Sequence, residues 1–541
     1  MRNSSLFNHI ELFAGCGGLS LGLDKAGFEL LLANELSPMA AETFSYNFFN
    51  EDFQQLARDN QKPEHAYWIS SQFENLLQRL RENPFQYPSY SFDNTDLPED
   101  TEQLKGNLVI GNIIQLNKLL ESNKELLNTI KNGFHGEGVD LVSGGPPCQS
   151  FSMAGLREKD SDKNTLPWEF ANFVEHTQPK IAVLENVTGI LRAFSDKKGN
   201  LFHAWFEVAK VFASKKYIPL CLHVNARFVG IPQNRPRFIM IAVRYDIFEQ
   251  LEKTFGDESA ERKLFEQSKT FYHLVQNEPK KAIFGSLPYF DVTKPNALLL
   301  FKTSFLHHLV EHKTVSVKEA LDDLKIHEPS KQSTFIKTLN KTFLTILQKR
   351  DKVYNHEYRS NSPYVQRRFR LYQVIQQCND TNIKKAVFNI LKGDVNIITD
   401  SIWDRLKTFE YLKEDNQMGK FSSKSEFIRY LQAHPTKKQT QKALDANAPA
   451  PAALSIPDDA CHYDQKELRV LTVREMARIQ SFPDNFVFRS KTTTGGQMRK
   501  FEVPQYTQVG NAVPPLLGLA LGKCIIELLN KLQKSENSLL N

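Results

Sequence analysis

The chain has 541 residues, of which 41% are hydrophobic and 24% charged, a composition typical of a globular protein with two lobes or more. Its six cysteines form no CxxC pair, which argues against a disulfide framework and a zinc site. It has no uncharged apolar run of about 18 residues, and no N-terminal basic segment followed by an apolar core. We therefore expect a cytoplasmic protein without a membrane span or bound metal.

The formal net charge of +6 is distributed unevenly. Between Lys331 and Thr440 there are 21 Lys and Arg against 10 Asp and Glu, a net of +11, so the rest of the chain sums to about −5. Such a concentrated basic block is typical of polyanion binding. A solvated basic face explains the same block without a ligand, so both interpretations stay open at this point.

The first 244 residues repeat a pattern of short apolar strand, loop with special residues, and helix-like segment. Strands alternating with helices predict a mainly parallel sheet with helices on both faces. Ligands in such sheets bind at the carboxyl ends of the strands. The predicted strands are 10–13, 30–33, 139–142, 181–184 and 238–243.

The pattern changes from about residue 245. The segment that follows is rich in Lys, Gln, Asn and Phe, and its end at 445–454 is rich in Ala and Pro, which predicts a flexible linker or surface loop. Regular structure returns in a helix predicted over 471–480, with Thr472 and Glu475 forming a capping box. The polar, carboxamide-rich residues 51–105 predict an insertion between two core strands. We expect a catalytic domain over 1–244, a second domain over 245–462 and a return to the first over 463–541.

A glycine-rich loop, Phe13 to Ser20, follows the first predicted strand and precedes a helix. Glycines there allow a sharp turn and a close approach of the backbone to a ligand. Glu35, at the end of the next strand, is placed to accept hydrogen bonds from ribose hydroxyls. The loop alone is weak evidence, because a nicotinamide-dependent oxidoreductase would carry a similar one.

Three further groups of residues also fall at strand ends. Pro146 and Pro147 stiffen the backbone directly before Cys148, which indicates a presented thiol, although a lone cysteine is more often buried and inert. Glu185 could hold or share a proton in a shielded pocket. Arg235 and Arg237, two residues apart, point to the same side of an extended chain. A surface carboxylate and a solvated pair of arginines are the alternatives.

Taken together and in this order, these motifs resemble the DNA (cytosine-5) methyltransferase family of the bacterial restriction-modification type. The matching stretches are FAGCGGLSLG from Phe13, NE at 34–35, GGPPCQSFS from Gly144, ENV from Glu185, QNRPR from Gln233, LTVREMARIQSFPDNF from Leu471 and QVGNAVPP from Gln508. The resemblance implies a Rossmann-like S-adenosylmethionine-dependent methyltransferase sheet. It also implies a second, smaller DNA target-recognition domain within 245–462.

The resemblance also implies a cofactor site for S-adenosyl-L-methionine. Glu35 resembles the ribose-binding acid, Leu36 lies beside the adenine, and Asn112 occupies a position where the family usually has Asp. An Asn side chain still offers one acceptor oxygen, so we expect retained but weaker binding. The cofactor-binding residues it implies are Phe13, Gly15, Gly17, Gly18, Leu19, Glu35, Leu36, Asn112, Ile113, Pro147, Asn511, Ala512 and Val513.

For the catalytic residues, the resemblance implies that the Cys148 thiolate adds to C6 of the target cytosine, so that C5 can take the methyl group. Glu185 then holds N3 and the 4-amino group, Arg237 holds O2, and Arg235 supports the nucleophile side. The cytosine must be flipped out of the duplex to reach this site.

The resemblance implies that the basic block recognises DNA. Its Lys and Arg side chains would contact phosphates, and a few polar side chains would contact base edges. The sequence offers Arg367, Arg368, Arg370, Asn355 and His356 as base-reading candidates, although a solvated helix face explains the arginines equally well. The segment 314–321 also resembles a recurrent family element.

Two relatives with the same core remain alternatives: an RNA cytosine-5 methyltransferase and a catalytically silent DNA-binding protein. The long basic region favours duplex DNA, and the presence of Cys148, Glu185, Arg235 and Arg237 favours an active enzyme. The chain begins directly at the catalytic core. We therefore expect a bacterial, monomeric modification enzyme that works beside a cognate restriction endonuclease.

Overall fold

The computed structural model describes residues 7–86, 94–134, 136, 138–147, 165–195, 201–310, 313–436, 441–452 and 454–540. Its centre is a nine-stranded sheet in the order β11-β9-β10-β6-β5-β1-β2-β4-β3. In the described chain β10 is antiparallel to both of its neighbours, and the other pairings of this sheet are parallel. The prediction of a mainly parallel α/β sheet is confirmed. The strands are β1 (Phe7–Leu12), β2 (Phe28–Glu35), β3 (Ala66–Trp68), β4 (Asn107–Ile110), β5 (Leu141–Gly144), β6 (Ile181–Val187), β9 (Tyr217–Asn225), β10 (Pro236–Arg244) and β11 (Phe290–Asp291).

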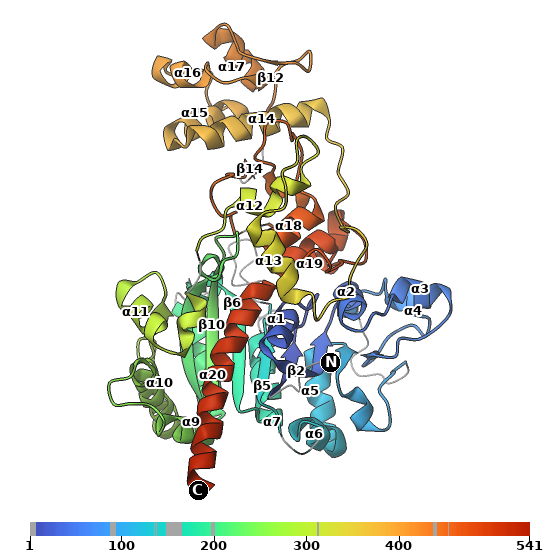
Figure 1. Cartoon of the computed structure of the whole chain (residues 1–541), viewed down its shortest axis with the longest axis vertical. Helices are drawn as coiled ribbons and strands as arrows, with labels where there is room; N and C mark the ends of the chain where they lie inside the picture. Colours follow the sequence, from blue (N-terminus) through green and yellow to red (C-terminus); the bar gives the residue numbers. More distant parts are fainter. Residues whose placement is uncertain are drawn as a thin grey trace.

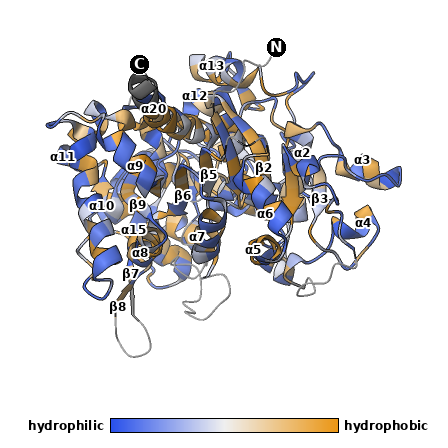
Figure 2. Cartoon of the chain, turned by 90° about the horizontal axis from the view of Figure 1, so that it is seen from below, coloured by the Kyte–Doolittle hydropathy of each residue, from blue (hydrophilic) through white to orange (hydrophobic). Residues whose placement is uncertain are grey.

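Helices cover both faces of the sheet, because its central strands are apolar on both sides and almost fully buried. Helix α1 (Gly18–Ala26) packs against α20 (Pro515–Leu540), and Figure 2 shows α20 above the sheet and α5 (Ile113–Ser122), α7 (Leu166–Thr177) and α8 (Ala204–Ser214) below it. The remaining helices around the sheet are α2 (Pro38–Phe48), α3 (Phe53–Arg58), α4 (Leu76–Arg79), α6 (Lys124–Lys131), α9 (Tyr245–Glu252), α10 (Ala260–Asn277) and α11 (Pro295–Thr303). A small hairpin of β7 (Ala193–Ser195) and β8 (Leu201–His203) lies outside the main sheet.

Helices α1 and α20 are in backbone contact because both carry small residues at every fourth position. A Cβ on Gly22 would lie 2.4 Å from the amide nitrogen of Leu519. On the other helix, a Cβ on Gly522 would lie 2.6 Å from the Cβ of Ala26. Only glycine fits at these crossings, so the start of the chain and its last helix are packed as one unit.

The polar segment 51–105 lies between β2 and β4, and it contributes more than a surface loop. Its strand β3 pairs with β4 and extends the sheet at one edge. Helices α3 and α4 precede and follow β3 in the chain and pack against each other. Phe53 of α3 and Leu76 of α4 lie in a small separate core.

A second part of the molecule stands beyond the carboxyl ends of the strands (Figure 1). Helices α12 (Val317–Leu321), α13 (Thr334–Phe343), α18 (Val473–Ile479) and α19 (Gln505–Asn511) pack next to the sheet around one core. Farther away, residues 363–436 together with 442–443, 460–461 and 468–470, called here the distal unit, surround a separate core. The distal unit contains α14 (Pro363–Cys378), α15 (Thr381–Lys392), α16 (Asp400–Leu406), α17 (Lys424–Gln432), β12 (Tyr411–Leu412), β13 (Met418–Gly419), β14 (Lys442–Ala443) and β15 (Ala460–Cys461).

The described residues of 445–454 form no helix or strand and are partly exposed, as predicted for a surface loop, but hydrogen bonds hold them against another segment, which a flexible linker would not show. The amide of Ala450 donates to the carbonyl of Pro232 at 2.9 Å, and the amide of Asn234 donates to the carbonyl of Ala450 at 2.7 Å. Ala450 is buried in the second core. Small side chains such as alanine allow this close packing against another segment. An alanine-rich linker has the same composition, so composition alone does not separate the two cases.

Within the described ranges, no single helix is long and apolar enough to cross a membrane. The bent pair Gly496–Asn511 and Pro515–Lys534, at 66° to one another, meets the criteria of length and composition only. Its second helix packs against α1 in the main core.

Candidate active site

A cavity of about 450 Å³ lies at the carboxyl ends of β1, β2, β4, β5 and β6. Its size is within the range of small-molecule sites. Of the residues predicted from the sequence, those lining it are Phe13, Gly15, Leu19, Glu35, Leu36, Asn112, Ile113, Pro147, Glu185, Arg235, Arg237, Asn511, Ala512 and Val513. Cys148 lies outside the described residues, directly after Pro147.

The glycine loop is held to the end of β2 by one carboxylate. The amide of Gly15 donates to Oε2 of Glu35 at 2.8 Å, and the amide of Ser37 donates to Oε1 at 2.7 Å. Phe13 and Gly15 both have positive φ values, 55° and 58°, which give the loop its sharp turn. Burial raises the pKa of Glu35, while these backbone hydrogen bonds favour its ionised form.

Gly17 and Gly18 do not line the cavity described above; they permit close packing beside it. A Cβ on Gly18 would lie 2.2 Å from the carbonyl oxygen of Val513, and one on Gly17 would lie 2.4 Å from the ring of Phe48. The loop is therefore in direct contact with the late segment that completes the cavity. Glycine is needed here for contact with protein, a different role from the predicted contact with a ligand.

Asn112 follows β4 and is the N-cap of α5. Its Oδ1 accepts a hydrogen bond from the amide of Ile114 at 3.0 Å, as N-cap side chains do. The side chain of Asn34 donates to the carbonyls of Val109 and Gly111 at 3.0 and 3.1 Å, which fixes the end of β4 against β2.

Glu185 and Arg237 form a buried ion pair at the opposite side of the cavity. Arg237 Nε lies 2.6 Å from Glu185 Oε1, and the two residues project from the paired strands β6 and β10. Burial lowers the pKa of Arg237, although the charge of Glu185 partly offsets this effect. Asn186 donates to the carbonyl of Pro146 at 3.0 Å, so the end of β6 also holds the loop that leads to Cys148.

Arg235 contacts the C-terminal segment of the cavity wall. Its Nη2 donates to the carbonyl oxygens of Gly510 at 2.8 Å and Ala512 at 3.1 Å. Burial lowers the pKa of Arg235, and the charge of Arg237 lowers it further. Arg235 therefore binds the backbone of residues 510–512, a role that the sequence comparison did not anticipate.

Several residues that the sequence did not single out also line the cavity. Among them are Pro84 and Phe85 from the 51–105 segment, and Phe501 and Val503 from the stretch before α19. Glu11 on β1 lines it as well, and burial raises the pKa of its carboxyl group to about 8 while Ser20 donates a hydrogen bond to it. None of these positions carries a local motif, so only the fold could identify them.

Three of the base-reading candidates are wrong, because their polar atoms are bonded inside the protein. Asn355 is buried and donates to the carbonyl of Phe488. His356 lies within hydrogen-bond distance of Thr472 Oγ1 and the carbonyl of Leu324. Arg370 is buried and donates to the carbonyl of Glu410.

The two remaining candidates, Arg367 and Arg368, are half-buried. Their guanidinium groups donate to backbone carbonyls of the distal unit, at 413–414 for the first and 435 for the second. Both arginines therefore stabilise the distal unit itself.

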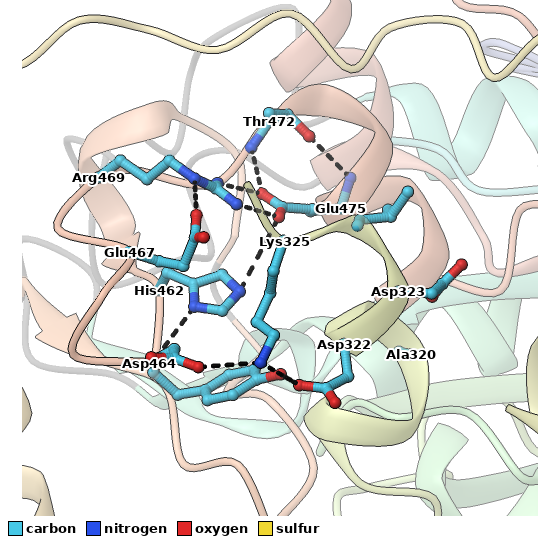
Figure 3. A network of polar contacts seen from close by, with 12 residues as sticks. Ala320, Asp322, Asp323, Lys325, His462, Asp464, Glu467, Arg469, Thr472 and Glu475 are labelled. Carbon is cyan, nitrogen blue, oxygen red and sulfur yellow. Dashed lines mark hydrogen bonds and ion pairs between the residues drawn. The ribbon is translucent and has the colours of Figure 1, made fainter. Parts of the chain in front are cut away.

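The predicted helix with its capping box is confirmed at Val473–Ile479. Thr472 Oγ1 accepts from the amide of Glu475 at 3.2 Å, and Glu475 accepts from the amide of Thr472 at 2.8 Å. Figure 3 shows Arg469 directed at the same carboxylate, with two N–H groups donating at 2.8 Å. Burial alone would raise the pKa of Glu475, but the hydrogen bonds from Arg469 hold it below its ordinary value. The motif is structural, since within the described chain no residue of α18 lines the cavity.

The chain matches the C-5 cytosine-specific DNA methylase family over residues 7–74 and 115–527. It is 26% identical over 525 residues to the type II methyltransferase M.DdeI of Desulfomicrobium norvegicum, covering 96% of this chain and 88% of that protein. It is 25% identical over 525 residues to the type II methyltransferase M1.HphI of Haemophilus parahaemolyticus, covering 96% and 87%. Among solved structures it is similar to the Dnmt2 methyltransferase of S. pombe, with a TM-score of 0.41, 13% identity and coverage of 97% and 99%. The family match spans most of the sequence, and the chain therefore belongs to the C-5 cytosine-specific DNA methylases and is a DNA cytosine-5 methyltransferase.

Proposed function

We propose that the enzyme transfers a methyl group from S-adenosyl-L-methionine to C5 of a cytosine flipped out of a specific duplex DNA sequence, through a covalent adduct between Cys148 and C6. The observation that carries this proposal is the continuity of the cavity. The Glu35 side and the Glu185–Arg237 pair border one space, so a methyl donor and a base can meet in it.

The cavity fits the cofactor in shape and in chemistry. A turn with positive φ at Gly15 exposes backbone, Glu35 offers carboxylate oxygens for ribose hydroxyls, and Leu36 with Ile113 adds apolar surface. Phe13, Leu19, Pro147, Asn511, Ala512 and Val513 would complete the site. When bound, the cofactor supplies an electrophilic methyl group.

Glu185 and Arg237 suit a cytosine ring. A carboxyl group can hold N3 and the 4-amino group, and a guanidinium can donate to O2. Because both are buried, the base must leave the stack and lose its hydration to reach them. Arg235 would not contact the base itself; it would hold residues 510–512 in place.

The reaction begins when the Cys148 thiolate forms a bond to C6, while Glu185 supplies a proton to N3. C5, which gains the displaced electron pair, would then take the methyl group, and the methyl–sulfur bond of the donor would break with its electron pair staying on sulfur, so that S-adenosylhomocysteine leaves. Loss of the C5 proton to a base, return of the N3 proton to Glu185 and elimination of the Cys148 thiolate would then restore the aromatic ring and the enzyme. Cys148 follows Pro146 and Pro147, whose fixed backbone angles limit where the thiol can move.

We assign DNA recognition to residues 245–462, with the distal unit as its separately folded part and 463–541 as the return to the catalytic domain. The basic block within it would contact phosphates. We also propose that the enzyme acts as a monomer in a bacterial cytoplasm and protects DNA from a cognate restriction endonuclease; its similarity to type II methyltransferases supports the last point.

Labelled S-adenosylmethionine tests the proposal when it is offered with duplex DNA and, separately, with RNA. We expect label in DNA, and none with Cys148→Ser, whereas the control Cys378→Ser in the distal unit stays active. DNA containing 5-fluorocytosine should form a stable adduct with the wild type, because C5 cannot lose a proton. Label in RNA alone, or an active Cys148→Ser variant, would refute the proposal.

A further inference from the structure

A second cavity, of about 220 Å³ and called here the distal pocket, lies between α14, α15 and β14. The rings of Tyr372 and Phe388 stack with their centroids 6.0 Å apart and form an apolar part of its wall. Most of the remaining wall is polar. The polar side chains used below are Gln376, Asn379, Thr381, Lys384, Gln441 and Lys442. No strand of the nine-stranded sheet contributes to this pocket, so it is separate from the candidate active site.

The distal pocket carries two lysine side chains. Lys384 lies in the first turn of α15, and Lys442 begins β14. Among the residues that the structure describes, neither ammonium group has an ion-pair partner. Partial burial lowers the pKa of Lys442, and the charge of Lys384 lowers it further. Two like charges held close together without a counter-charge favour the binding of an anion between them.

Asp380 also lines the distal pocket, but its carboxylate is already bound within the protein. Its Oδ1 accepts from the amide of Asn382 at 2.8 Å and from the amide of Ile383 at 3.3 Å. Its Oδ2 pairs with Arg405. These bonds, first among them the one from Asn382, hold the pKa of Asp380 below its ordinary value. Since Arg405 balances this carboxylate, the two lysines keep their excess of positive charge.

Gln441 brings an amide group to the same pocket. The residue is only 6% exposed, and in the described part of the chain its side chain has no hydrogen-bond partner. Buried amides nearly always have a partner, so an unpartnered one at a cavity indicates that a ligand supplies it. Gln376 and Thr381 add further donors to the wall. Two cations together with neutral N–H and O–H donors suit the oxygens of a phosphate.

The distal pocket lies on the side of the distal unit that is nearer to the sheet. Figure 1 shows α14 and α15 as the lower layer of the unit and β14 below them, with α16 and α17 farther away. A duplex that delivers a cytosine to Glu185 and Arg237 approaches the carboxyl ends of the strands, and the distal unit stands beyond those ends. The pocket is therefore placed on the side of the unit that faces such a duplex.

We propose that the distal pocket binds a backbone phosphate of duplex DNA, with Lys384 and Lys442 as its cations and Gln441 as a neutral donor. This inference rests on the proposed assignment of DNA recognition to residues 245–462. A phosphate contact fixes the position of a protein on the duplex without reading its sequence. The pocket thus contributes affinity and orientation, and the same contact is made on every DNA sequence.

Fluorescence anisotropy of the full-length protein with a labelled duplex of mixed sequence tests the proposal over a series of salt concentrations. We expect the double variant Lys384→Gln/Lys442→Gln to bind more weakly. The slope of log affinity against log salt concentration should become shallower by about 1, because one phosphate contact is lost. Lys385→Gln/Lys392→Gln is the matched control, since it removes the same charge from exposed positions of α15 that do not line the pocket. Its slope should equal that of the wild type.

Gln441→Leu separates a ligand contact from a structural role. It removes a donor but no charge, so DNA binding should weaken about fivefold with an unchanged salt slope. Its thermal unfolding temperature should be no lower than that of the wild type, because an apolar side chain of similar size replaces a buried amide that has no partner in the described protein. A variant that binds DNA like the wild type would overturn the assignment of Gln441 and with it the proposal.

Equal slopes for the lysine double variant and its control would also overturn the proposal, because general positive charge would then account for binding. Inorganic phosphate is a separate probe of the pocket. If it raises the thermal unfolding temperature only when Lys384 and Lys442 are present, while the double variant binds DNA normally, the pocket takes small anions and the proposal is wrong. A wild type that binds no duplex DNA at all would instead refute the proposed function.

Discussion

The backbone of Gly145 lies directly against the carboxylate of Glu185. A Cβ on Gly145 would stand 3.0 Å from Glu185 Oε2 and 3.7 Å from its carbonyl oxygen. The glycine before the two prolines therefore leaves room for the carboxylate that pairs with Arg237 at 2.6 Å. The loop leading to Cys148 and the group proposed to hold the cytosine are fitted to each other.

Gly145→Ala should lower kcat at least tenfold, because the added methyl group displaces the Glu185 carboxylate from the base while the Glu35 side is untouched. Binding of S-adenosylhomocysteine should stay within twofold of wild type. Gly495→Ala is the control, since a Cβ there meets nothing within 4 Å. Steady-state kinetics and calorimetry measure both effects, and a normal kcat would show that the carboxylate tolerates the shift.

Arg235→Lys should raise the KM for S-adenosylmethionine and destabilise the protein by about 1–3 kcal/mol. A lysine cannot reach both the Gly510 and Ala512 carbonyls, so buried acceptors lose their donors. Arg58→Lys, on the exposed surface of α3, should change stability by no more than about 0.5 kcal/mol. Urea unfolding compares the two, and equal losses would argue against the bridging role of Arg235.

Asn112→Asp should strengthen cofactor binding severalfold. The carboxylate retains the N-cap hydrogen bond to Ile114 and adds an acceptor and a favourable charge at the start of α5. Asn123→Asp is a close control, because Asn123 is the N-cap of α6 and does not line the cavity. Both variants should gain a few tenths of a kcal/mol in stability, but only the first should bind S-adenosylhomocysteine more tightly. Equal affinity in both would mean that residue 112 acts only as a cap.

His9→Leu should make the free energy of unfolding depend less on pH below about 6.5. Burial lowers the pKa of His9 to about 3, and within the described chain neither ring nitrogen has a hydrogen-bond partner. Between pH 6.5 and 3 the unfolded state therefore binds more protons than the folded state, so wild-type stability falls as the pH falls, by about 1.4 kcal/mol per unit from this residue. The variant lacks that loss. Urea unfolding at pH 7 and pH 5 should show a smaller difference for the variant, and parallel profiles would contradict the assignment.

The parts of the site that could be predicted from the sequence are those encoded locally. Glu35 and Glu185 were placed at strand ends because an apolar run followed by polar residues identifies such an end, and parallel strands bring these ends together. Thr472 and Glu475 were predicted as a capping box because the box needs only residues three apart. In both cases the pattern that supports the prediction spans only a few consecutive residues.

The remaining features depend on contacts between distant segments. The alanines of 445–454 resemble a linker until Ala450 is seen between Pro232 and Asn234. Arg370 and Asn355 counted as candidates for DNA contact in a basic block, but their partners are buried backbone carbonyls far along the chain. Phe85 has no motif of its own, and its place at the cavity follows from the pairing of β3 with β4. The position of Cys148 stays a prediction.

The glycine contacts between α1 and α20 have a consequence for how the enzyme is made. The glycine loop leaves the ribosome long before residues 513–519, yet Gly18 packs against Val513 and Gly22 against Leu519. A nascent chain of 500 residues would already hold Cys148, Glu185 and Arg237 but would still lack Asn511 to Val513 and α20. The proposed cofactor site is thus completed only after residues 511–519 have been made, so a chain that stops before them would lack one of its walls.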